Sequence, residues 1–355
     1  MPKISLSHCG ALIVFCLSII SACDQPTPAV KNTQPPMLAV YTQLIIPWHQ
    51  GFAQANKTLV ERIERFCQNP ANPGEYQEAR SAWQASFIAW QPLNLLHFGP
   101  LSLGDLRLHI YFWPDRFNWV EKHLKNRLNQ SDTATDTTGP ASALGLADME
   151  YLLFDTAYTD NAALAGATCD LLRSASSQIN NRAQELLNHW QLGTLGAWQA
   201  PSLASRSDAQ TLALKNLIDS LISSFTRITQ EELIAPIGSL DTPAANPLIS
   251  QAWRANLGKA ALLSELKAAN ALLHLGLAPL AKTPQQQALQ RTLKEHLNQL
   301  HAELTNTPGE LVFLINTELG RKQLIHAAEE MQKMTAMLTR LADSLAAQEH
   351  PQPTH

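Results

Sequence analysis

The sequence predicts an all-α protein whose body consists of two helical-bundle domains, and three observations support this prediction. Apolar residues recur at intervals of three and four over long stretches, whereas the alternation typical of half-buried strands is absent. Asparagine, glycine and proline fall between these stretches, where they end or begin helices. The folded body spans roughly 315 residues, which exceeds the usual size of a single hydrophobic core.

The N-terminal segment has the pattern of a bacterial lipoprotein signal. Lys3 supplies a positive charge, and the apolar run over 11–20 has the length of a signal peptide, too short for a membrane span. Residues 20–23 (Ile-Ser-Ala-Cys) resemble a lipobox, so we expect residues 1–22 to be a cleaved signal peptide and Cys23 to be lipidated. An ordinary secretory signal with an incidental cysteine is the alternative.

The segment after the signal predicts a tethered protein that faces the periplasm. Residues 23–37 comprise the lipidated Cys23 and a flexible tether rich in Pro, Thr and Gln. Asp24 resembles an inner-membrane retention signal of enteric bacteria, and the outer membrane is the alternative destination. The expected partners are the membrane, through the lipid, and other proteins of the bacterial cell envelope.

The helices of the body follow from the apolar periodicity and from the residues that punctuate it. The first domain, 38–200, is expected to hold five helices, and the second, 201–350, to be a four-helix bundle with short connections. A single elongated bundle is the alternative architecture. Thr283 and Pro284 are typical of an N-cap and the first helical residue. The expected helices span 38–68, 75–91, 114–129, 142–155, 160–191, 207–234, 247–277, 284–305 and 309–348.

The cysteines predict one disulfide in the mature protein. Cys9 and Cys16 are lost with the signal peptide and Cys23 takes the lipid, which leaves Cys67 and Cys169 in an oxidising compartment. A disulfide between them would join two helices of the first domain and stabilise it by about 4–5 kcal/mol in the chain-entropy model. Two buried free thiols or a metal site are the alternatives, although two cysteines without a further Cys or His make a poor zinc site.

Glu150 is the first candidate for a functional residue. The helix expected around it is apolar over nearly its whole circumference, so it is predicted to be buried. A buried carboxylate must be paired, hydrogen-bonded or protonated. Glu150 is therefore interpreted as a metal ligand or as a binding residue in a cleft, with Asp148 as a helper. The alternative is a structural ion pair with an arginine such as Arg80.

Other candidate binding residues have equally plausible structural roles. Arg80, Trp83 and Trp90 lie on one helical face, which indicates either a buried core stripe or a pocket wall with Arg80 as its polar end. Asp115 stands at the start of an expected helix, where it is either a cap or a site residue.

The segment around Glu150 resembles the signature of the imelysin-like family, also called peptidase family M75. That signature runs Gly-x-His-x-x-Glu before an apolar stretch; Gly145 and Glu150 match it, whereas Ala147 stands where the family has His. The resemblance is strongest to a branch of periplasmic lipoproteins and implies two helical-bundle halves. Further matching segments are Ala79-Arg80-x-x-Trp83, Trp90, Phe98-Gly99-Pro100, Phe112-Trp113-Pro114-Asp115, Ala235-Pro236-Ile237-Gly238 and Ala252-Trp253-Arg254-x-Asn256-Leu257.

The composition and the motifs narrow the function. The formal charge of −4, with acids and bases interspersed, gives no basic stripe for a nucleic acid. The sequence contains no Gly-x-Ser-x-Gly elbow, no His-Glu-x-x-His helix and no Gly-rich phosphate loop, so no catalytic residue is identified. A metallopeptidase needs about three protein ligands and an open position for water, and this chain lacks the motif histidine. We therefore expect a protein that is not an enzyme, with M75-type peptidase activity as a less favoured alternative.

The expected function is that of a binding lipoprotein. The resemblance implies a link to the uptake of iron or another divalent metal, with Glu150 as the candidate metal ligand. The alternative is a scaffold lipoprotein that contacts other proteins and binds no small ligand.

Overall fold

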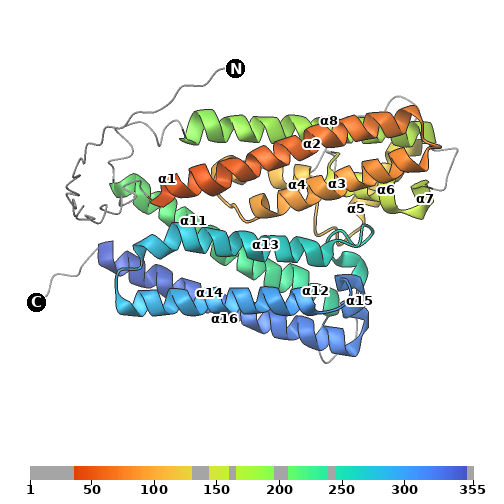
Figure 1. Ribbon diagram of the computed structural model, residues 1–355. Helices are drawn as coiled ribbons and strands as arrows, with labels where there is room; N and C mark the ends of the chain where they lie inside the picture. The colour runs from red at the N-terminus through yellow and green to blue at the C-terminus, as the bar shows by residue number, and fades with distance from the viewer. Residues whose placement is uncertain (1–35, 130–143, 160–164, 196–206, 239–244, 350–355) are drawn as a thin grey trace, which may run out of the picture. The chain divides into compact units, whose positions relative to one another are not determined.

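The computed structural model describes residues 36–129, 144–159, 165–195, 207–238 and 245–349, and these ranges contain helices and no strand (Figure 1). The prediction of an all-α protein is thereby confirmed. The expected signal peptide, Cys23 and nearly all of the tether lie outside the described residues. None of the described helices is long and apolar enough to cross a bilayer.

Three long helices build the first half of the chain. They are α2 (Ile46–Gln68), α3 (Pro73–Asn94) and α8 (Ala165–Asn188), and α2 lies along both of the others (Figure 1). Before α2 the chain is already helical, through α1 (Pro36–Val40) and a π-helical turn (Tyr41–Ile45). Another π-helical turn (His189–Leu195) follows α8.

An asparagine cap begins α3 shortly after the end of α2, and a disulfide joins α2 to α8. The side chain of Asn72 accepts a hydrogen bond from the Gly74 N–H at 2.9 Å and caps α3, as asparagine commonly does. Cys67 near the end of α2 and Cys169 near the start of α8 form the expected disulfide, with their Cα atoms 5.5 Å apart.

Short elements between α3 and α8 carry the candidate site. They are a 3₁₀ turn (Gly99–Ser102), α4 (Leu106–Ile110), α5 (Trp119–Asn129), α6 (Leu146–Phe154) and α7 (Thr156–Thr159). The helix expected over 114–129 begins only at Trp119, which corrects that prediction. The Asp115 carboxylate accepts the N–H groups of Trp119 and Val120, at 2.7 and 2.9 Å, and so fixes the start of α5.

The second half contains α11 (Ser207–Arg227), α13 (Gly258–Leu272), α14 (Pro284–Asn306) and α16 (Glu318–Glu349), with α14 alongside α13 and α16 (Figure 1). A π-helical turn (Ile228–Ile234) and α12 (Ala235–Ile237) extend α11, and a π turn (Leu273–Leu277) and a 3₁₀ turn (Ala278–Leu280) extend α13. Thr283 caps α14 as expected, because its hydroxyl accepts the Gln286 N–H at 3.2 Å.

Two expected helices of this half are interrupted. The helix expected over 247–277 begins at Gly258; before it lie a 3₁₀ turn (Pro247–Ile249) and a non-helical loop in which Ala252 and Asn256 have positive φ. The helix expected over 309–348 is two helices, α15 (Leu311–Asn316) and α16. The two helices meet so closely that a Cβ atom at Gly320 would lie 2.3 Å from the Leu314 carbonyl oxygen.

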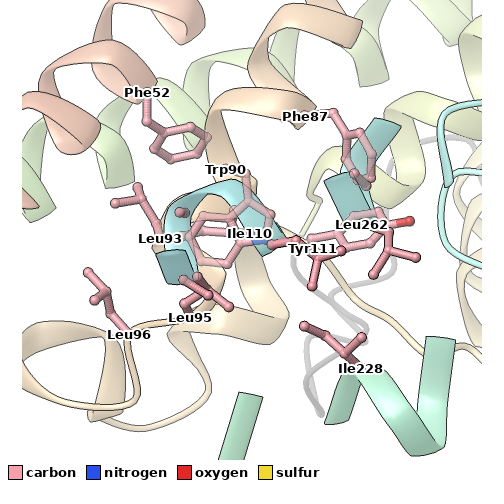
Figure 2. Close-up of a cluster of buried hydrophobic side chains, with 14 of the residues drawn as sticks. Phe52, Phe87, Trp90, Leu93, Leu95, Leu96, Ile110, Tyr111, Ile228 and Leu262 are labelled. Carbon is pink, nitrogen blue, oxygen red and sulfur yellow. The ribbon is translucent and has the colours of Figure 1, made fainter. Parts of the chain in front are cut away.

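One hydrophobic core runs through both halves. Figure 2 shows Phe52 of α2 beside Trp90 of α3, and Phe87 of α3 beside Tyr111. Ile228 and Leu262 from the second half belong to the same buried cluster. The expected domain boundary at residue 200 lies outside the described residues, so the division into two domains stays a prediction.

Candidate functional site

Glu150 lies buried on α6, and a loop from the second half of the chain binds its carboxylate. Its Oε1 accepts the backbone N–H groups of Arg254 at 2.9 Å and of Ala255 at 3.2 Å. Only 4% of the residue is exposed. A carboxylate that accepts two N–H groups is partly compensated for its loss of water. Glu150 therefore binds a distant loop, and within the described ranges its carboxylate is bonded by backbone N–H groups and not by an arginine side chain.

The carboxylate faces a pocket of about 210 Å³ between α6, α5 and the loop before α13. Ala147, the residue at the histidine position of the motif, lines the same pocket, as does Asp115. The complete lining is Tyr111, Phe112, Trp113, Asp115, Asn118, Val120, Glu121, Ala147, Glu150, Tyr151, Leu248, Ile249, Ser250, Ala252, Trp253 and Arg254. The pocket is thus lined by several aromatic side chains and by one buried carboxylate, that of Glu150.

Burial sets the protonation of this site. It raises the pKa of Glu150 to about 7, although the Ala255 and Arg254 N–H groups and the Arg254 charge favour the ionised form. The neighbouring Tyr111 hydroxyl accepts the Ala252 N–H at 2.9 Å. Burial, and then the nearby Glu150 charge, hold the pKa of Tyr111 well above its usual value. Glu150 therefore changes charge close to neutral pH, whereas the Tyr111 phenol stays neutral.

In addition to the backbone bonds to Glu150, the side chain of Arg254 contacts α6 and the residue that follows it. Its Nε donates to Asp155 Oδ2 at 2.9 Å, just beyond the end of α6. Its guanidinium lies over the ring of Tyr151 at 3.3 Å and over that of Trp253 at 4.1 Å from the ring centre. Ion pair and cation–π contacts together fix this side chain at the pocket wall.

Asp148 faces away from the pocket. Its Oδ2 accepts the Gly145 N–H at 2.8 Å, which caps the start of α6, and Oδ1 has no hydrogen-bond partner in the described part of the chain. Burial raises the pKa of Asp148 to about 7. Asp148 thus supports the helix that carries Glu150 but does not line its pocket.

The other candidates from α3 also lie outside the pocket. The Arg80 guanidinium lies over the rings of Phe154 and Tyr76, at 4.4 and 5.4 Å, so it is not the partner of Glu150. Trp83 is fully buried, and its Nε1 donates to the Leu146 carbonyl oxygen at 2.9 Å. Trp90 is a core residue, as Figure 2 shows. Of the α3 residues, Trp83 thus holds the first turn of α6 in place.

The sequence model of the Imelysin family (peptidase M75) matches residues 45–348 of this chain. The chain belongs to the imelysin family. No curated protein matches it.

Two solved structures share the fold of this imelysin family member. An imelysin-like protein from Psychrobacter arcticum 273-4 has a TM-score of 0.71 at 20% identity, covering 87% of this chain and 94% of that one. A protein from Parabacteroides distasonis ATCC 8503, provisionally named an iron-regulated protein A precursor, has a TM-score of 0.69 at 12% identity, covering 86% and 94%. At these identities the likeness shows the fold alone.

The residues of this imelysin pocket do not make a resident metal site. Ala147 offers no ligand atom, and both Asp115 oxygens accept N–H groups of α5. Across the described ranges, no group of three or more His, Cys, Asp and Glu side chains could hold a metal ion. Glu121, the third carboxylate of the lining, pairs with Lys125 at 2.7 Å. Glu150 is then the one remaining ligand, which is fewer than a structural or catalytic metal ion needs.

Sequence reasoning missed the polar network behind the loop. Gln251 Nε2 donates to Glu232 Oε2 at 2.7 Å, and Arg227 pairs with Glu232 and, at 2.7 Å, with Glu265. Asn94 of α3 donates to Glu265 at 2.8 Å. Burial and then the Glu265 charge raise the pKa of Glu232 to about 8. The one signal in the sequence was the pair of acids, Glu232 and Glu265, within otherwise apolar helical stretches.

Proposed function

We propose that this imelysin family member is a non-enzymatic binding lipoprotein of the bacterial cell envelope, and that its ligand enters the pocket at Glu150. One observation carries the proposal. Oε1 of Glu150 accepts two N–H groups, whereas Oε2 accepts no hydrogen bond from the described residues. Oε2 is not among their fully buried unpaired atoms, so it reaches the open space of the pocket that Glu150 lines. A carboxylate oxygen that opens into a pocket and has no protein partner is suited to a ligand that donates a hydrogen bond or coordinates a metal ion.

The same geometry favours binding over hydrolysis. A metal-dependent hydrolase holds its ion with about three protein ligands and keeps a position open for water. Of the three carboxylates that line this pocket, Asp115 accepts two N–H groups of α5 and Glu121 pairs with Lys125. Glu150 is the remaining one, and Ala147 stands where the resembled motif has histidine. The site therefore favours a binding protein over an M75-type peptidase.

A link to metal uptake is part of the proposal. It is supported by the structural neighbour whose name calls it iron-regulated. Two of the three carboxylates in the pocket lining, those of Asp115 and Glu121, already have protein partners. A metal cargo would therefore bring most of its own ligands, as a metal complex does. Glu150 would then contact the cargo by one oxygen, and the aromatic walls would cover the organic part of the complex.

The test is a titration of the purified protein with ferric citrate and, separately, with free ferrous iron. We expect the parent to bind ferric citrate more tightly than the free ion, and Glu150→Gln to weaken that binding at least tenfold while staying folded. Glu121→Gln is the matched control, because Glu121 lines the same pocket but pairs with Lys125 at 2.7 Å. If neither form of iron binds and Glu150→Gln melts at a much lower temperature, Glu150 is a structural residue only.

Lipidation is tested separately. In a bacterial host, Cys23→Ala is expected to abolish incorporation of labelled fatty acid and to release the protein from the membrane fraction. Unchanged labelling in Cys23→Ala would refute the anchor.

A scaffold role is the second candidate, and exposed apolar residues beside the pocket favour it. Phe117 and Trp119 flank the pocket residue Asn118, and Leu248 lines the pocket itself. Their exposed fractions are 69%, 52% and 56%. Exposed apolar side chains gathered at one place often mark a protein contact. If in-cell crosslinking to an envelope protein is lost in Phe117→Ser while ferric citrate does not bind, the scaffold role is the better account.

A further inference from the structure

A small pocket of about 180 Å³ lies between the end of α13, the π-helical turn Leu273–Leu277 and the first half of α14. It shares no lining residue with the pocket at Glu150. Its volume is below the roughly 300–1,000 Å³ that is usual for small-molecule sites, so it suits an ion or a headgroup rather than a whole organic ligand. Its polar lining residues are Asn270, His274, Gln290, Arg291 and Lys294.

Basic side chains and no acidic ones line this pocket, which we call the basic pocket. Arg291 and Lys294 stand three positions apart on α14, so they share a face of that helix. His274 adds an imidazole from the π-helical turn, and all three residues are exposed to an incoming ligand. Glu295, which follows Lys294, does not line the pocket. The like charges of Arg291 and Lys294 repel each other, and an anion between them would relieve that repulsion.

The cations of the basic pocket have no acidic partner in the part of the chain that the structure describes. Neither Arg291 nor Lys294 forms an ion pair there. Elsewhere in the same half, the exposed Lys322 and Lys333 each pair with a glutamate, at 2.8 and 2.7 Å. The sequence explains the difference, because residues 266–294 include no Asp or Glu. The positive charge at the basic pocket is therefore available to an anionic ligand.

The kinds of side chain at the basic pocket favour a phosphate group among anions. The Arg291 guanidinium has the fork of N–H groups that binds two oxygens of a phosphate, and the Lys294 ammonium adds a point charge. His274 supplies one further N–H group even when its imidazole is neutral. A phosphate group has enough oxygens to engage all three side chains, whereas a carboxylate has only two.

The basic pocket lies close to the start of the described chain. Its π-helical turn packs against α1, the first described helix. The approach is close, because a Cβ atom at Gly276 would lie 3.2 Å from Cγ2 of Val40. Cys23 stands thirteen positions before Pro36, and the chain between them can reach at most about 45 Å. A lipid on Cys23 would therefore keep the basic pocket near the membrane surface.

We propose that the basic pocket binds a phosphate group, and that phospholipids of the membrane supply it. The choice of this source rests on the lipid anchor proposed above. The phosphate of an anionic phospholipid would hold this end of the protein against the bilayer, where each Lys or Arg near the surface adds to the attraction. A soluble phosphate compound has the same chemistry, and the test distinguishes the two sources.

The test uses the mature chain with Cys23→Ser, so that no lipid anchor contributes to binding. One arm is a calorimetric titration with inorganic phosphate. The other measures binding at physiological salt to vesicles of phosphatidylglycerol and phosphatidylcholine. We expect Arg291→Gln/Lys294→Gln to weaken binding about tenfold or more in both arms. Lys322→Gln/Lys333→Gln is the matched control, which removes the same charge from α16 and should change binding by less than about twofold because salt screens distant charges.

The two arms separate the outcomes. All four substituted positions are exposed, so the fold should be retained. A loss confined to Arg291→Gln/Lys294→Gln in the vesicle arm supports a lipid phosphate. The same loss with inorganic phosphate alone supports the phosphate site but overturns the membrane as its source. Binding in neither arm, or equal losses in the two double variants, would overturn the inference. Glu150→Gln should leave both arms unchanged, which separates this site from the pocket at Glu150.

Discussion

At the scale of single residues, Ala147 decides what the imelysin pocket can hold. It and Glu150 stand three positions apart on α6 and line the same pocket. A histidine at position 147 would bring its ring nitrogens to the side of α6 that carries the carboxylate. Alanine at this position leaves α6 without the ligand that the resembled signature carries there.

Ala147→His is therefore expected to create affinity for a divalent ion. We predict that Zn²⁺ binds at least tenfold more tightly to Ala147→His than to the parent, because imidazole and carboxylate are both good zinc ligands. Isothermal titration calorimetry measures this difference. Ala147→Gln controls for side-chain size, and Ala147→His/Glu150→Gln should lose the gain. Equal zinc affinity in the Gln and His variants would show that the new side chain cannot reach Glu150.

The protonation of Glu150 gives a second prediction at this scale. Its pKa rises from an ordinary 4.5 in the unfolded chain to about 7 in the folded one, so the folded state binds the proton more tightly. The stability that this proton supplies is present below pH 4.5 and is lost as the pH rises through about 7. Gln at position 150 does not titrate, so Glu150→Gln does not lose stability in this way as the pH rises. The free energy of unfolding of the variant minus that of the parent should therefore increase by about 1–3 kcal/mol from pH 5 to pH 8.

The measurement is urea unfolding of parent and Glu150→Gln at several pH values. The quantity to compare is the difference in free energy of unfolding between the two proteins. Buried His49 also makes stability depend on pH, in the opposite direction, but it is present in both proteins and its contribution cancels in the difference. Burial lowers the pKa of His49 to about 3, so this residue favours folding as the pH rises towards 6.5. A pH-independent difference between parent and variant would mean that Glu150 does not titrate in this window.

At the scale of elements, the loop before α13 is held by partners on several helices. Gln251 bonds to Glu232, the Ala252 N–H bonds to Tyr111, and Arg254 and Ala255 supply the N–H groups for Glu150. Ala252 itself has a backbone φ of 47°, which residues other than glycine rarely adopt unless the surrounding contacts hold them there. The pocket wall therefore depends on side chains that the loop does not contain.

Gln251→Ala is expected to loosen this wall. It leaves an oxygen of buried Glu232 without its partner, so we predict a loss of about 1–3 kcal/mol in the free energy of unfolding. Hydrogen exchange at the Arg254 and Ala255 amides should also become faster. Gln299→Ala is the control, because Gln299 is exposed and its hydrogen bond to Glu303 leaves no buried group without a partner when it is lost. Unchanged exchange at these two amides would show that Gln251 does not position the loop.

The same loop marks the limit of prediction from the sequence. The long helices were predictable where the chain carries its own signals, as at Thr283 and Pro284. The starts at Trp119 and Gly258 were not, because Asp115, Tyr111 and Glu150 fix the preceding segments through contacts formed only on folding. Burial of Glu150 followed from the apolar sequence around it. Its backbone partners lie more than one hundred residues away, and apolar periodicity carries no information about them.

At the scale of the whole molecule, the two halves of the chain contact each other both at the candidate site and outside it. The Trp113 Nε1 donates to the Ile249 carbonyl oxygen at 3.0 Å, and the His97 N–H donates to the Ser220 hydroxyl at 2.9 Å. With the bonds to Glu150 and the shared core, these contacts couple the first half to the second. The disulfide, in contrast, closes a loop of 102 residues within the first half alone.

This difference predicts how the chain unfolds. Because the core is continuous, we expect one cooperative thermal transition for both halves. Cys67→Ser/Cys169→Ser should move that whole transition to a lower temperature, since the lost cross-link is worth about 4–5 kcal/mol in the chain-entropy model. Differential scanning calorimetry of parent and variant gives the comparison, and the single variant Cys67→Ser shows any effect of a free thiol. Two separate transitions, of which only one shifts in the variant, would instead establish the two halves as independent domains and the pocket at Glu150 as an interface between them.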